Sequence, residues 1–346
     1  MPNDKRVGYA VVGLGRISQV AVLPAFRHSR KAKLVAVVSG DPRKAKRLAT
    51  RFGASASYTY EDYDRCLANP DVNAVFIATD NGTHARYSVW AAQAGRHVLC
   101  EKPMARTPDE CREMIRACRQ SNVRLMIAYR KYFEPASLAL KRMVTAGKLG
   151  RLKLIHSAFT IFLPSRKSVP AWHLDPASSG GGSLVDLGVY CVNTIRWLTE
   201  QEPIEASAYS WCTHPECFSQ VEESIGFQLK FPDALFVQAT ASFGAAQANF
   251  LKVFGERGWA MLDPAFAFDE ERRLFGKIGR RWFEKRFRVI DEFALELDAF
   301  ADCIRRGRDP EPDGLEGLRD VLVMQAVYQA AREDRWVPIE SSQKAL

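Results

Sequence analysis

The chain has 346 residues, 47% of them hydrophobic, and a formal net charge of +9 at pH 7. That length is enough for two packed cores, whereas no apolar run approaches the roughly 20 residues of a membrane helix, which excludes a membrane-spanning protein. The eight cysteines are scattered without a CxxC pair, which indicates reduced thiols and argues against a disulfide scaffold. Because the first apolar run begins within a few residues of Met1, we expect no secretory signal and a cytoplasmic location.

Residues 1–127 alternate short apolar runs with helical patterns. The apolar runs lie at residues 6–13, 33–40, 73–79, 97–100 and 124–129. The helical patterns lie at residues 23–29, 41–53, 84–95 and 108–121. Short strands that are apolar at every position and are separated by helices indicate a parallel sheet covered on both faces. We therefore predict an α/β Rossmann domain, with a doubly wound parallel sheet, over residues 1–127.

Residues 128–346 follow a different pattern. A helix is expected at residues 135–147, and segments of alternating hydrophobicity follow at residues 151–162, 204–213, 221–231, 234–243 and 249–263. Alternation over such lengths indicates antiparallel strands with one face on a core. Helical patterns at residues 291–307 and 314–333 close the chain. The prediction is a C-terminal α+β domain with a large open, mostly antiparallel sheet, whose final helices pack either on it or back on the first domain.

Two further stretches have more than one interpretation. Much of the positive charge lies in residues 271–288, where basic and aromatic residues alternate as in some nucleic-acid binders. No nucleic-acid fold motif accompanies this stretch, so we favour a two-stranded excursion with a solvated basic face. The stretch CTHPEC offers Cys212, His214 and Cys217 but no fourth ligand, so we favour an ordinary loop over a metal site.

The sequence VVGLGRIS places two glycines where the first strand meets the first helix. Gly13 permits the tight turn, and Gly15 lets the backbone approach a pyrophosphate at the helix N-terminus. The third position of the G-x-G-x-x-G pattern is Ser18, which is small enough for close packing of the helix on the strand. Because a strand precedes the pattern and a helix follows it, dinucleotide binding is favoured over a turn that binds nothing.

The residues after the second strand favour NADP over NAD. An NAD-selective site usually carries an acid at the end of this strand, which binds the ribose hydroxyls. Here the strand ends at Ser39 and Gly40, and Arg43 and Lys44 follow on the first turn of the next helix. One hydroxyl and two cations are thus available for a 2′-phosphate. Asp41 leaves two alternatives open, because its carboxylate either caps that helix or repels the phosphate.

Two polar constellations point to the chemistry. HVLCEKPMA places Lys102 just beyond the carboxyl end of a strand, where ligands bind in open α/β sheets and where a lysine stabilises a developing alkoxide. The alternative is a surface lysine beside a rigid turn. In GGGSLVDLGVYCVN, Asp186 and Tyr190 are spaced i, i+4 and share one helix face, which suits binding of a polyol and transfer of its proton. A capping aspartate and a packed tyrosine explain that spacing equally well.

Together these residues resemble the glucose–fructose oxidoreductase/inositol dehydrogenase (Gfo/Idh/MocA) family over nearly the whole chain. The resemblance rests on YAVVGLGRIS, HVLCEKPMA and GGGSLVDLGVYCVN, and it extends to residues 128–135, 292–307 and 315–331. Tyr190, the YR and EP pairs within residues 129–135, and VVSGDPRKAK are most similar to the glucose–fructose oxidoreductase branch. That branch uses NADP and oxidises aldoses at C1. The resemblance also implies a cis peptide bond before Pro103 and a homodimer or homotetramer that pairs through the open sheet.

The resemblance implies a role for each site residue. Lys102 orders the substrate hydroxyl and the nicotinamide, Asp186 binds sugar hydroxyls, and Tyr190 is the acid/base. The implied cofactor contacts are Gly13, Gly15, Arg16, Ile17, Ser39, Gly40, Arg43, Lys44, Thr79, Asn81, His84, Glu101, Lys102, Arg130 and Trp172. The implied substrate contacts are Lys102, Arg130, His173, Asp186 and Tyr190.

Two positions depart from the family pattern. His173 stands where an arginine is expected against the nicotinamide, and Asp80 stands where proline is usual. His173 is therefore either a substrate contact or a loop residue without a role.

The expected function is an NADP-dependent transfer of hydride from C1 of a glucose- or xylose-like aldose to give a lactone, with or without coupled reduction of a second sugar. The alternatives on the same fold are a trans-dihydrodiol dehydrogenase and an imine reductase. A catalytically silent NADP-binding regulator is disfavoured because Lys102 and Tyr190 are both present. The expected partner is a small sugar, and we expect no metal, nucleic acid or membrane.

Overall fold

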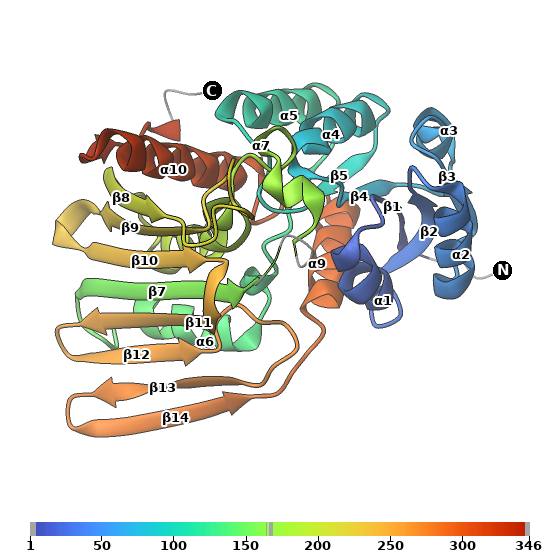
Figure 1. Ribbon diagram of the computed structural model, residues 1–346. Coiled ribbons are helices and arrows are strands. Elements are labelled where there is room, and N and C mark those ends of the chain that lie inside the picture. The colour runs from blue at the N-terminus through green and yellow to red at the C-terminus, as the bar shows by residue number, and fades with distance from the viewer. Residues whose placement is uncertain (1–4, 164, 166–168, 343–346) are drawn as a thin grey trace. The chain divides into compact units, whose positions relative to one another are not determined.

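The computed structural model describes residues 5–163, 165 and 169–342. The chain divides into two compact units, which are described separately. Unit 1 consists of residues 1–130 and 291–318, and unit 2 consists of residues 131–290 and 319–346 (Figure 1).

Unit 1 is built on a six-stranded sheet with the order β3-β2-β1-β4-β5-β6, in which all neighbouring strands are parallel. The strands are β1 (Val7–Val12), β2 (Ala32–Val38), β3 (Ala56–Tyr58), β4 (Ala74–Ile77), β5 (His97–Cys100) and β6 (Leu125–Ile127). Every residue of β1 and β4 is buried, as expected for a sheet covered on both faces. The predicted doubly wound Rossmann architecture is therefore confirmed.

The helices of unit 1 follow the predicted order, with several short helical segments in addition. They are η1 (Ser18–Val22), α1 (Leu23–Ala25), α2 (Pro42–Phe52), α3 (Tyr63–Ala68), η2 (Asn81–Thr83), α4 (His84–Gln93), α5 (Pro108–Gln120) and α9 (Glu292–Arg306). The helix α2 starts with a proline and ends at Gly53, whose φ of 78° is the left-handed conformation that glycine adopts readily. The sequence patterns did not indicate β3 or α3, because both are short and β3 is only half-buried.

Unit 2 is built on a nine-stranded sheet with the order β14-β13-β12-β11-β7-β10-β9-β8-β15. The strands are β7 (Leu152–Phe162), β8 (Glu205–Trp211), β9 (Ser224–Lys230), β10 (Phe236–Ser242), β11 (Gly244–Gly255), β12 (Gly258–Asp263), β13 (Arg272–Ile278), β14 (Arg281–Phe287) and β15 (Val337–Pro338). The pair β7–β10 is parallel, and every other neighbouring pair is antiparallel. The predicted large, mostly antiparallel sheet is confirmed.

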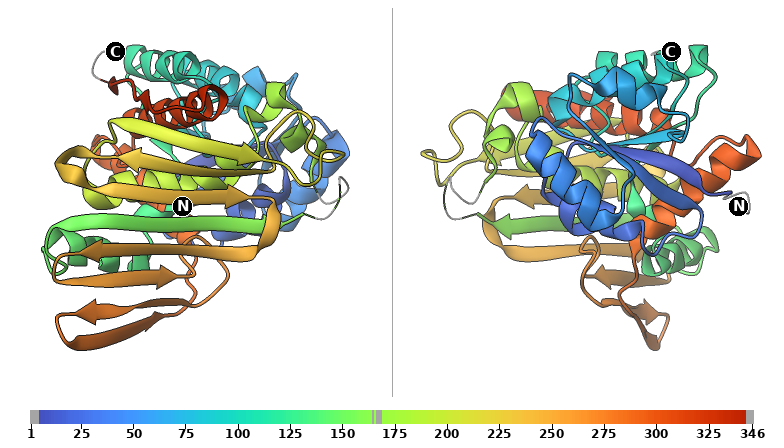
Figure 2. Two further views of the ribbon diagram at one scale, coloured as in Figure 1. Left: turned by 60° about the vertical axis from the view of Figure 1, so that its left-hand side comes forward. Right: turned by 90° about the vertical axis from the view of Figure 1, so that its right-hand side faces the viewer.

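The two faces of this sheet differ. The remaining helices of the chain are η3 (Arg130–Tyr132), α6 (Pro135–Thr145), η5 (Ala171–Leu174), α7 (Pro176–Ser179), η6 (Leu184–Gly188), α8 (Val189–Thr199), η7 (Pro232–Ala234) and α10 (Gly314–Glu333). Helices α6 and α8 lie behind the sheet in Figure 1 and in the left view of Figure 2, and α8 packs on β7, which carries the buried Ile155. On the other face, Tyr209 and Trp282 are 70% and 68% exposed.

One predicted strand proves to be a hairpin. The alternating segment at residues 249–263 contains the end of β11 and all of β12, which pair antiparallel around a turn at Glu256 and Arg257. A Cβ atom on Gly258 would lie 2.1 Å from the carbonyl oxygen of Lys277, so this position of the hairpin requires glycine. The prediction of one strand was wrong because it passed over the Gly-Glu-Arg-Gly turn at residues 255–258, which interrupts the apolar alternation.

The basic stretch at residues 271–288 forms the predicted two-stranded excursion. Strands β13 and β14 pair along their whole length at the edge of the sheet. The cations lie over aromatic rings of the same hairpin, with Arg273 5.1 Å from the centroid of Phe275 and Lys277 5.6 Å from that of Trp282. Among the helices of the described chain, none is both long enough and apolar enough to cross a bilayer.

Candidate active site

The glycine turn of unit 1 joins β1 to the helical segment that begins with η1. Gly13 has a φ of 93°, and a Cβ atom there would lie 2.4 Å from the carbonyl oxygen of Ala78 at the end of β4. The hydroxyl of Ser18 is fully buried and donates to the carbonyl oxygen of Gly13 at 2.6 Å, which draws the helix against the strand. A Cβ atom on Gly15 would meet nothing within 4 Å. The turn therefore leaves open space beside exposed backbone at Gly15 and Arg16, where a pyrophosphate fits.

The residues after β2 confirm one of the two alternatives for Asp41, the helix cap. Its Oδ1 atom accepts from the backbone amides of Arg43 at 2.9 Å and Lys44 at 3.0 Å, so it caps the N-terminus of α2. The amide of Lys44 holds the pKa of Asp41 below its usual range. Ser39 is buried next to this cap, and its hydroxyl accepts from the amide of Asp41. Arg43 is exposed and Lys44 is half-buried on the first turn of the same helix, and their contact with a phosphate stays a prediction.

The turn that carries Lys102 is held from behind by His84. The peptide bond between Lys102 and Pro103 is cis, as the family resemblance implied. The Nδ1 atom of His84 lies 3.0 Å from the carbonyl oxygen of Pro103, so Nδ1 carries the proton and donates it. Because His84 is fully buried, its pKa is lowered and the ring stays neutral. The structure thus gives His84 a supporting role, and its contact with a cofactor stays a prediction.

The loop after β4 brings Thr79 and Asp80 together. The hydroxyl of Thr83 lies 2.9 Å from that of Thr79 and 3.1 Å from a carboxylate oxygen of Asp80. Asp80 precedes η2 and thus serves the turn in place of the usual proline. Asn81 is buried in the same turn. These residues lie at the carboxyl end of the parallel sheet, as their predicted cofactor contacts require.

Arg130 lies inside unit 1 and not on its surface. Its guanidinium donates to the carboxylate of Glu292 at 2.7 Å, and both side chains are buried. Glu296, one helical turn further along α9, is also fully buried, and burial raises its pKa well above the ordinary value. Glu101 is a charged neighbour of Glu296 and accepts from the amide of Lys102 at 3.1 Å. The sequence patterns did not indicate this acidic cluster, and the cofactor and substrate contacts of Arg130 stay predictions.

In unit 2, Asp186 and Tyr190 lie on one continuous helical segment. A π-helical turn, η6, carries Asp186 and leads directly into α8, which carries Tyr190. Single π-helical turns within α-helices are frequent at functional sites. Both side chains remain partly accessible. The predicted helix is confirmed, although its first turn is wider than an α-helical turn.

Two aromatic residues, one on β7 and one in the loop after β12, pack against the ring of Tyr190. Its centroid lies 5.6 Å from that of Phe159 on β7 and 5.8 Å from that of Phe266. Phe159 and Phe266 stack on one another at 5.4 Å. The phenol is therefore supported by an apolar surface, which fixes the ring so that its hydroxyl has a defined position.

The segment before the glycines adds two residues to the surroundings of Asp186. The Nδ1 atom of His173 lies 3.7 Å from a carboxylate oxygen of Asp186. The ring of Trp172 packs edge-on against that of His173, with centroids 3.8 Å apart. Unit 2 thus brings together a carboxylate, an imidazole and an indole, which can bind several hydroxyl groups and one apolar face of a sugar ring.

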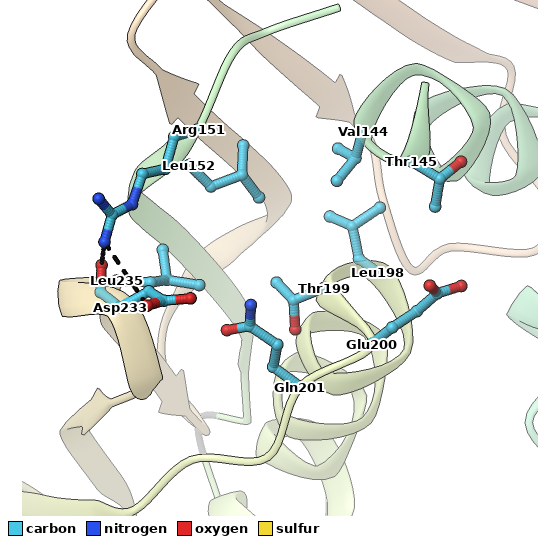
Figure 3. A pocket seen from close by; sticks show the side chains of 10 residues that line it. All are labelled: Val144, Thr145, Arg151, Leu152, Leu198, Thr199, Glu200, Gln201, Asp233 and Leu235. Carbon is cyan, nitrogen blue, oxygen red and sulfur yellow. Dashed lines mark hydrogen bonds and ion pairs between the residues drawn. The ribbon is translucent and has the colours of Figure 1, made fainter. Parts of the chain in front are cut away.

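Unit 2 also contains a pocket away from these residues and a loop with possible metal ligands. A cavity of about 240 Å³ at the C-terminal end of α8 is lined by Arg151, Gln201 and Asp233 among others (Figure 3). The guanidinium of Arg151 donates to the backbone oxygen of Asp233 at 2.7 Å, so the charge of Arg151 is used within the loop. In the CTHPEC loop, His214 Nδ1 lies 2.5 Å from a carboxylate oxygen of Glu223, and no group of metal ligands occurs among the described residues.

Comparisons with known proteins agree with this geometry. Residues 7–129 match an oxidoreductase family with an NAD-binding Rossmann fold, and residues 137–261 match the GFO/IDH/MocA C-terminal domain. The chain is 30% identical over 342 residues to D-xylose 1-dehydrogenase (NADP(+)) of Haloarcula marismortui, which covers 98% of this chain and 94% of the relative. It is 28% identical over 319 residues to trans-1,2-dihydrobenzene-1,2-diol dehydrogenase of Mus musculus, covering 88% and 90%. The crystal structure of aldose-aldose oxidoreductase from Caulobacter crescentus, complexed with glycerol, superposes with a TM-score of 0.92 at 34% identity and covers 96% of this chain and 100% of that one.

Proposed function

The chain belongs to the Gfo/Idh/MocA family of oxidoreductases, and we propose that within this family it oxidises an aldose at C1 with NADP, giving a lactone. It is a sugar oxidoreductase related to the D-xylose dehydrogenases and to aldose-aldose oxidoreductase. The observation that carries the finer proposal is the arrangement of Asp186, Tyr190 and His173 in unit 2, which suits a hydroxyl-rich ring.

The proposal assigns one role to each reacting side chain. The nicotinamide of NADP, when bound, supplies the hydride acceptor. Lys102 donates to the oxygen of the reacting hydroxyl and stabilises the negative charge that develops there. Tyr190 accepts the hydroxyl proton, and its support by Phe159 and Phe266 keeps the phenol in place for that transfer. Asp186 accepts hydrogen bonds from neighbouring sugar hydroxyls, with His173 beside it.

Selectivity for NADP is proposed to depend on the end of β2. The residues present fit a 2′-phosphate, because Ser39 offers a hydroxyl while Arg43 and Lys44 offer cations at the N-terminus of α2. Asp41, the only acid in this stretch from Ser39 to Lys44, has its carboxylate turned to the helix amides. A cofactor with a free ribose 2′-hydroxyl finds no other carboxylate in this stretch.

A second sugar is a further candidate substrate. The structural relative at 34% identity is an aldose-aldose oxidoreductase, and this likeness favours a reaction in which the reduced cofactor passes its hydride to another aldose. The diol dehydrogenase relative favours oxidation of a cyclic diol instead, at lower identity. We propose the aldose first because Asp186 and His173 form a polar surface, whereas a cyclic diol offers only two hydroxyls to bind it.

Isotope transfer tests the proposal. Purified protein is incubated with NADP and with D-xylose or D-glucose that carries deuterium at C1, and the reduced cofactor is analysed by mass spectrometry. We expect the deuterium in NADPH and a lactone as the sugar product. Deuterium that stays in the sugar, together with oxidation of a trans-dihydrodiol, would assign the protein to the diol dehydrogenases. Transfer of the label to an added second aldose would establish the coupled reaction.

We also propose an oligomeric state and a cellular location for the protein, on the basis of the same family membership. The uncovered face of the nine-stranded sheet presents Tyr209 and Trp282, and we propose that a second copy of the chain covers it to form a homodimer or homotetramer. Light scattering during size-exclusion chromatography measures the mass directly. All eight cysteines are free thiols, which supports the proposal of a reducing cytoplasm.

A further inference from the structure

The glycines that precede Asp186 pack against the protein itself. A Cβ atom on Gly182 would lie 2.0 Å from the backbone oxygen of Glu222, and one on Gly181 would lie 2.0 Å from the hydroxyl of Tyr328. Glycine is therefore required at positions 181 and 182, because Tyr328 and Glu222 pack directly against the backbone there. Both of these residues belong to unit 2, as does the helix that follows the glycines.

Glu222 binds the start of that helix with both of its carboxylate oxygens. One oxygen accepts from the amide of Gly182 at 2.9 Å, and the other accepts from the amide of Leu184 at 2.8 Å. The amide of Ser183, between them, donates to the backbone oxygen of Glu222 at 3.3 Å. Three consecutive amides at a helix start, which otherwise lack partners, thus bind one residue. An ionised carboxylate at this position is further favoured by the helix dipole.

Tyr328 holds the same carboxylate from the other side. Its hydroxyl donates to Glu222 at 2.9 Å. The carboxylate therefore accepts three hydrogen bonds and has a fixed orientation. Burial raises the pKa of Glu222, and the amides and the phenol oppose that effect by favouring the ionised form.

These hydrogen bonds connect Glu222 to the helical turn that carries Asp186. The amide of Asp186 donates to the carbonyl oxygen of Gly182 at 3.2 Å, so the residue held by Glu222 holds the first turn of the helix in place. Asp186 lies within the π-helical turn, a feature that is rare in helices and frequent at functional sites. Tyr190 follows on the next turn of the same segment.

We propose that Glu222, with Tyr328, is the positioning residue of the site: it anchors the π-helical turn and thereby sets the places of Asp186 and Tyr190. This inference rests on the proposed function for its effect on turnover, but the anchor itself does not. Glu222 touches neither sugar nor cofactor in this scheme. Its effect should therefore appear in the chemical step and leave the binding of NADP by unit 1 unchanged.

Two matched substitutions test the anchor. In Glu222→Gln, one amide of the helix start faces an NH₂ group in place of an oxygen, while the size of the side chain is kept. Glu223→Gln is the control, because the neighbouring carboxylate binds Thr213 and His214 and makes no bond to the amides of residues 182–184 that the described structure records. We expect faster hydrogen exchange at residues 182–190 in Glu222→Gln and the wild-type rate there in Glu223→Gln.

Kinetics test the consequence for catalysis. Since displacement of a reacting group by about 1 Å costs roughly a hundredfold in rate, Glu222→Gln should lower kcat for the aldose by about 10- to 100-fold. The dissociation constant of NADP should stay at the wild-type value, and Glu223→Gln should keep the wild-type kcat. Tyr328→Phe, which removes a single hydroxyl, should give a smaller change of the same kind in both exchange and kcat. If Glu222→Gln does not fold, Tyr328→Phe provides the test in its place.

The outcomes separate this inference from the proposed function. Wild-type protein that oxidises no aldose contradicts the proposed function, and the exchange measurement then judges the anchor alone. Unchanged exchange at residues 182–190 in Glu222→Gln overturns the inference. Faster exchange with an unchanged kcat in an active enzyme also overturns it, because the turn would then be anchored without any effect on catalysis.

Discussion

The imidazole of His173 lies 3.7 Å from the carboxylate of Asp186, so a side chain that departs from the family pattern is a neighbour of the predicted sugar-binding acid. This relationship favours the first of the two alternatives for His173, a substrate contact. We predict that His173→Phe, which keeps a ring against Trp172, raises the KM for the aldose. Loss of one hydrogen bond worth about 1 kcal/mol corresponds to a change of roughly fivefold. Steady-state kinetics measure it, and an unchanged KM would leave His173 a loop residue.

Replacement of Lys102 by methionine should remove most of the turnover while the fold remains. The side chain follows a strand end that His84 and the buried sheet hold independently of the amine. Loss of one oriented charged donor at a developing alkoxide costs about 3 kcal/mol or more in the transition state, which is at least a hundredfold in kcat. Circular dichroism and the dissociation constant of NADP serve as controls. Near-normal turnover in Lys102→Met would remove Lys102 from the mechanism.

The variant Tyr190→Phe should lower kcat. The ring keeps its contacts with Phe159 and Phe266, so the change removes the hydroxyl and little else. Loss of a positioned acid/base group typically lowers the rate by about 100- to 10,000-fold, which steady-state kinetics measure. If the variant keeps the wild-type kcat, the proton goes elsewhere, and His173 becomes the next residue to replace.

At the start of α2, replacement of the two basic residues should change the cofactor preference, whereas replacement of Asp41 should change the stability of the protein. The double variant Arg43→Ala, Lys44→Ala should weaken NADP by roughly 10- to 100-fold for each lost contact and leave NAD nearly unchanged. Asp41→Ala should instead lower the melting temperature, because α2 loses its cap, without strengthening the binding of NAD. Calorimetric titration and thermal unfolding measure these effects. Wild-type protein that binds NAD as tightly as NADP would contradict the assignment.

The eight thiols should differ sharply in reactivity. Burial raises the pKa of Cys66, Cys118 and Cys191 to about 12, so these side chains stay protonated at pH 8 and are shielded as well. Cys212 is the exposed cysteine of the set. We expect iodoacetamide to modify Cys212 first in the folded protein, at a rate that increases with pH. Peptide mapping by mass spectrometry identifies the site, and early modification of a buried cysteine would show that the core opens.

Much of the fold could be predicted from the sequence because its signals are local. The apolar runs of unit 1 and the alternating segments of unit 2 each reflect one periodicity, and the glycine turn and the cis bond before Pro103 belong to contiguous motifs. The hairpin at residues 249–263 escaped because its Gly-Glu-Arg-Gly turn is short and lies between two alternating runs. Short elements such as β3 also escaped, since three half-buried residues carry no pattern.

The supporting residues of the site could not be predicted for a different reason. Glu222 lies 40 positions from Gly182 in the sequence, and Glu292 lies 162 positions from Arg130. Neither pair has a spacing that a single sequence displays, because the contact is created by the tertiary fold. The sequence therefore predicts which side chains carry chemistry, whereas the structure was needed to show which side chains hold them.

The capping role of Asp41 also bears on how cofactor preference changes during evolution. An acid at this place is the natural starting point for an NAD-binding site, yet here its carboxylate is the cap of α2. A descendant that drew this oxygen of Asp41 away from the amides and toward a ribose would destabilise that helix. The loss of the cap would oppose the shift toward NAD, so the proposed preference for NADP would be supported by the stability of one helix as well as by contacts with the ligand.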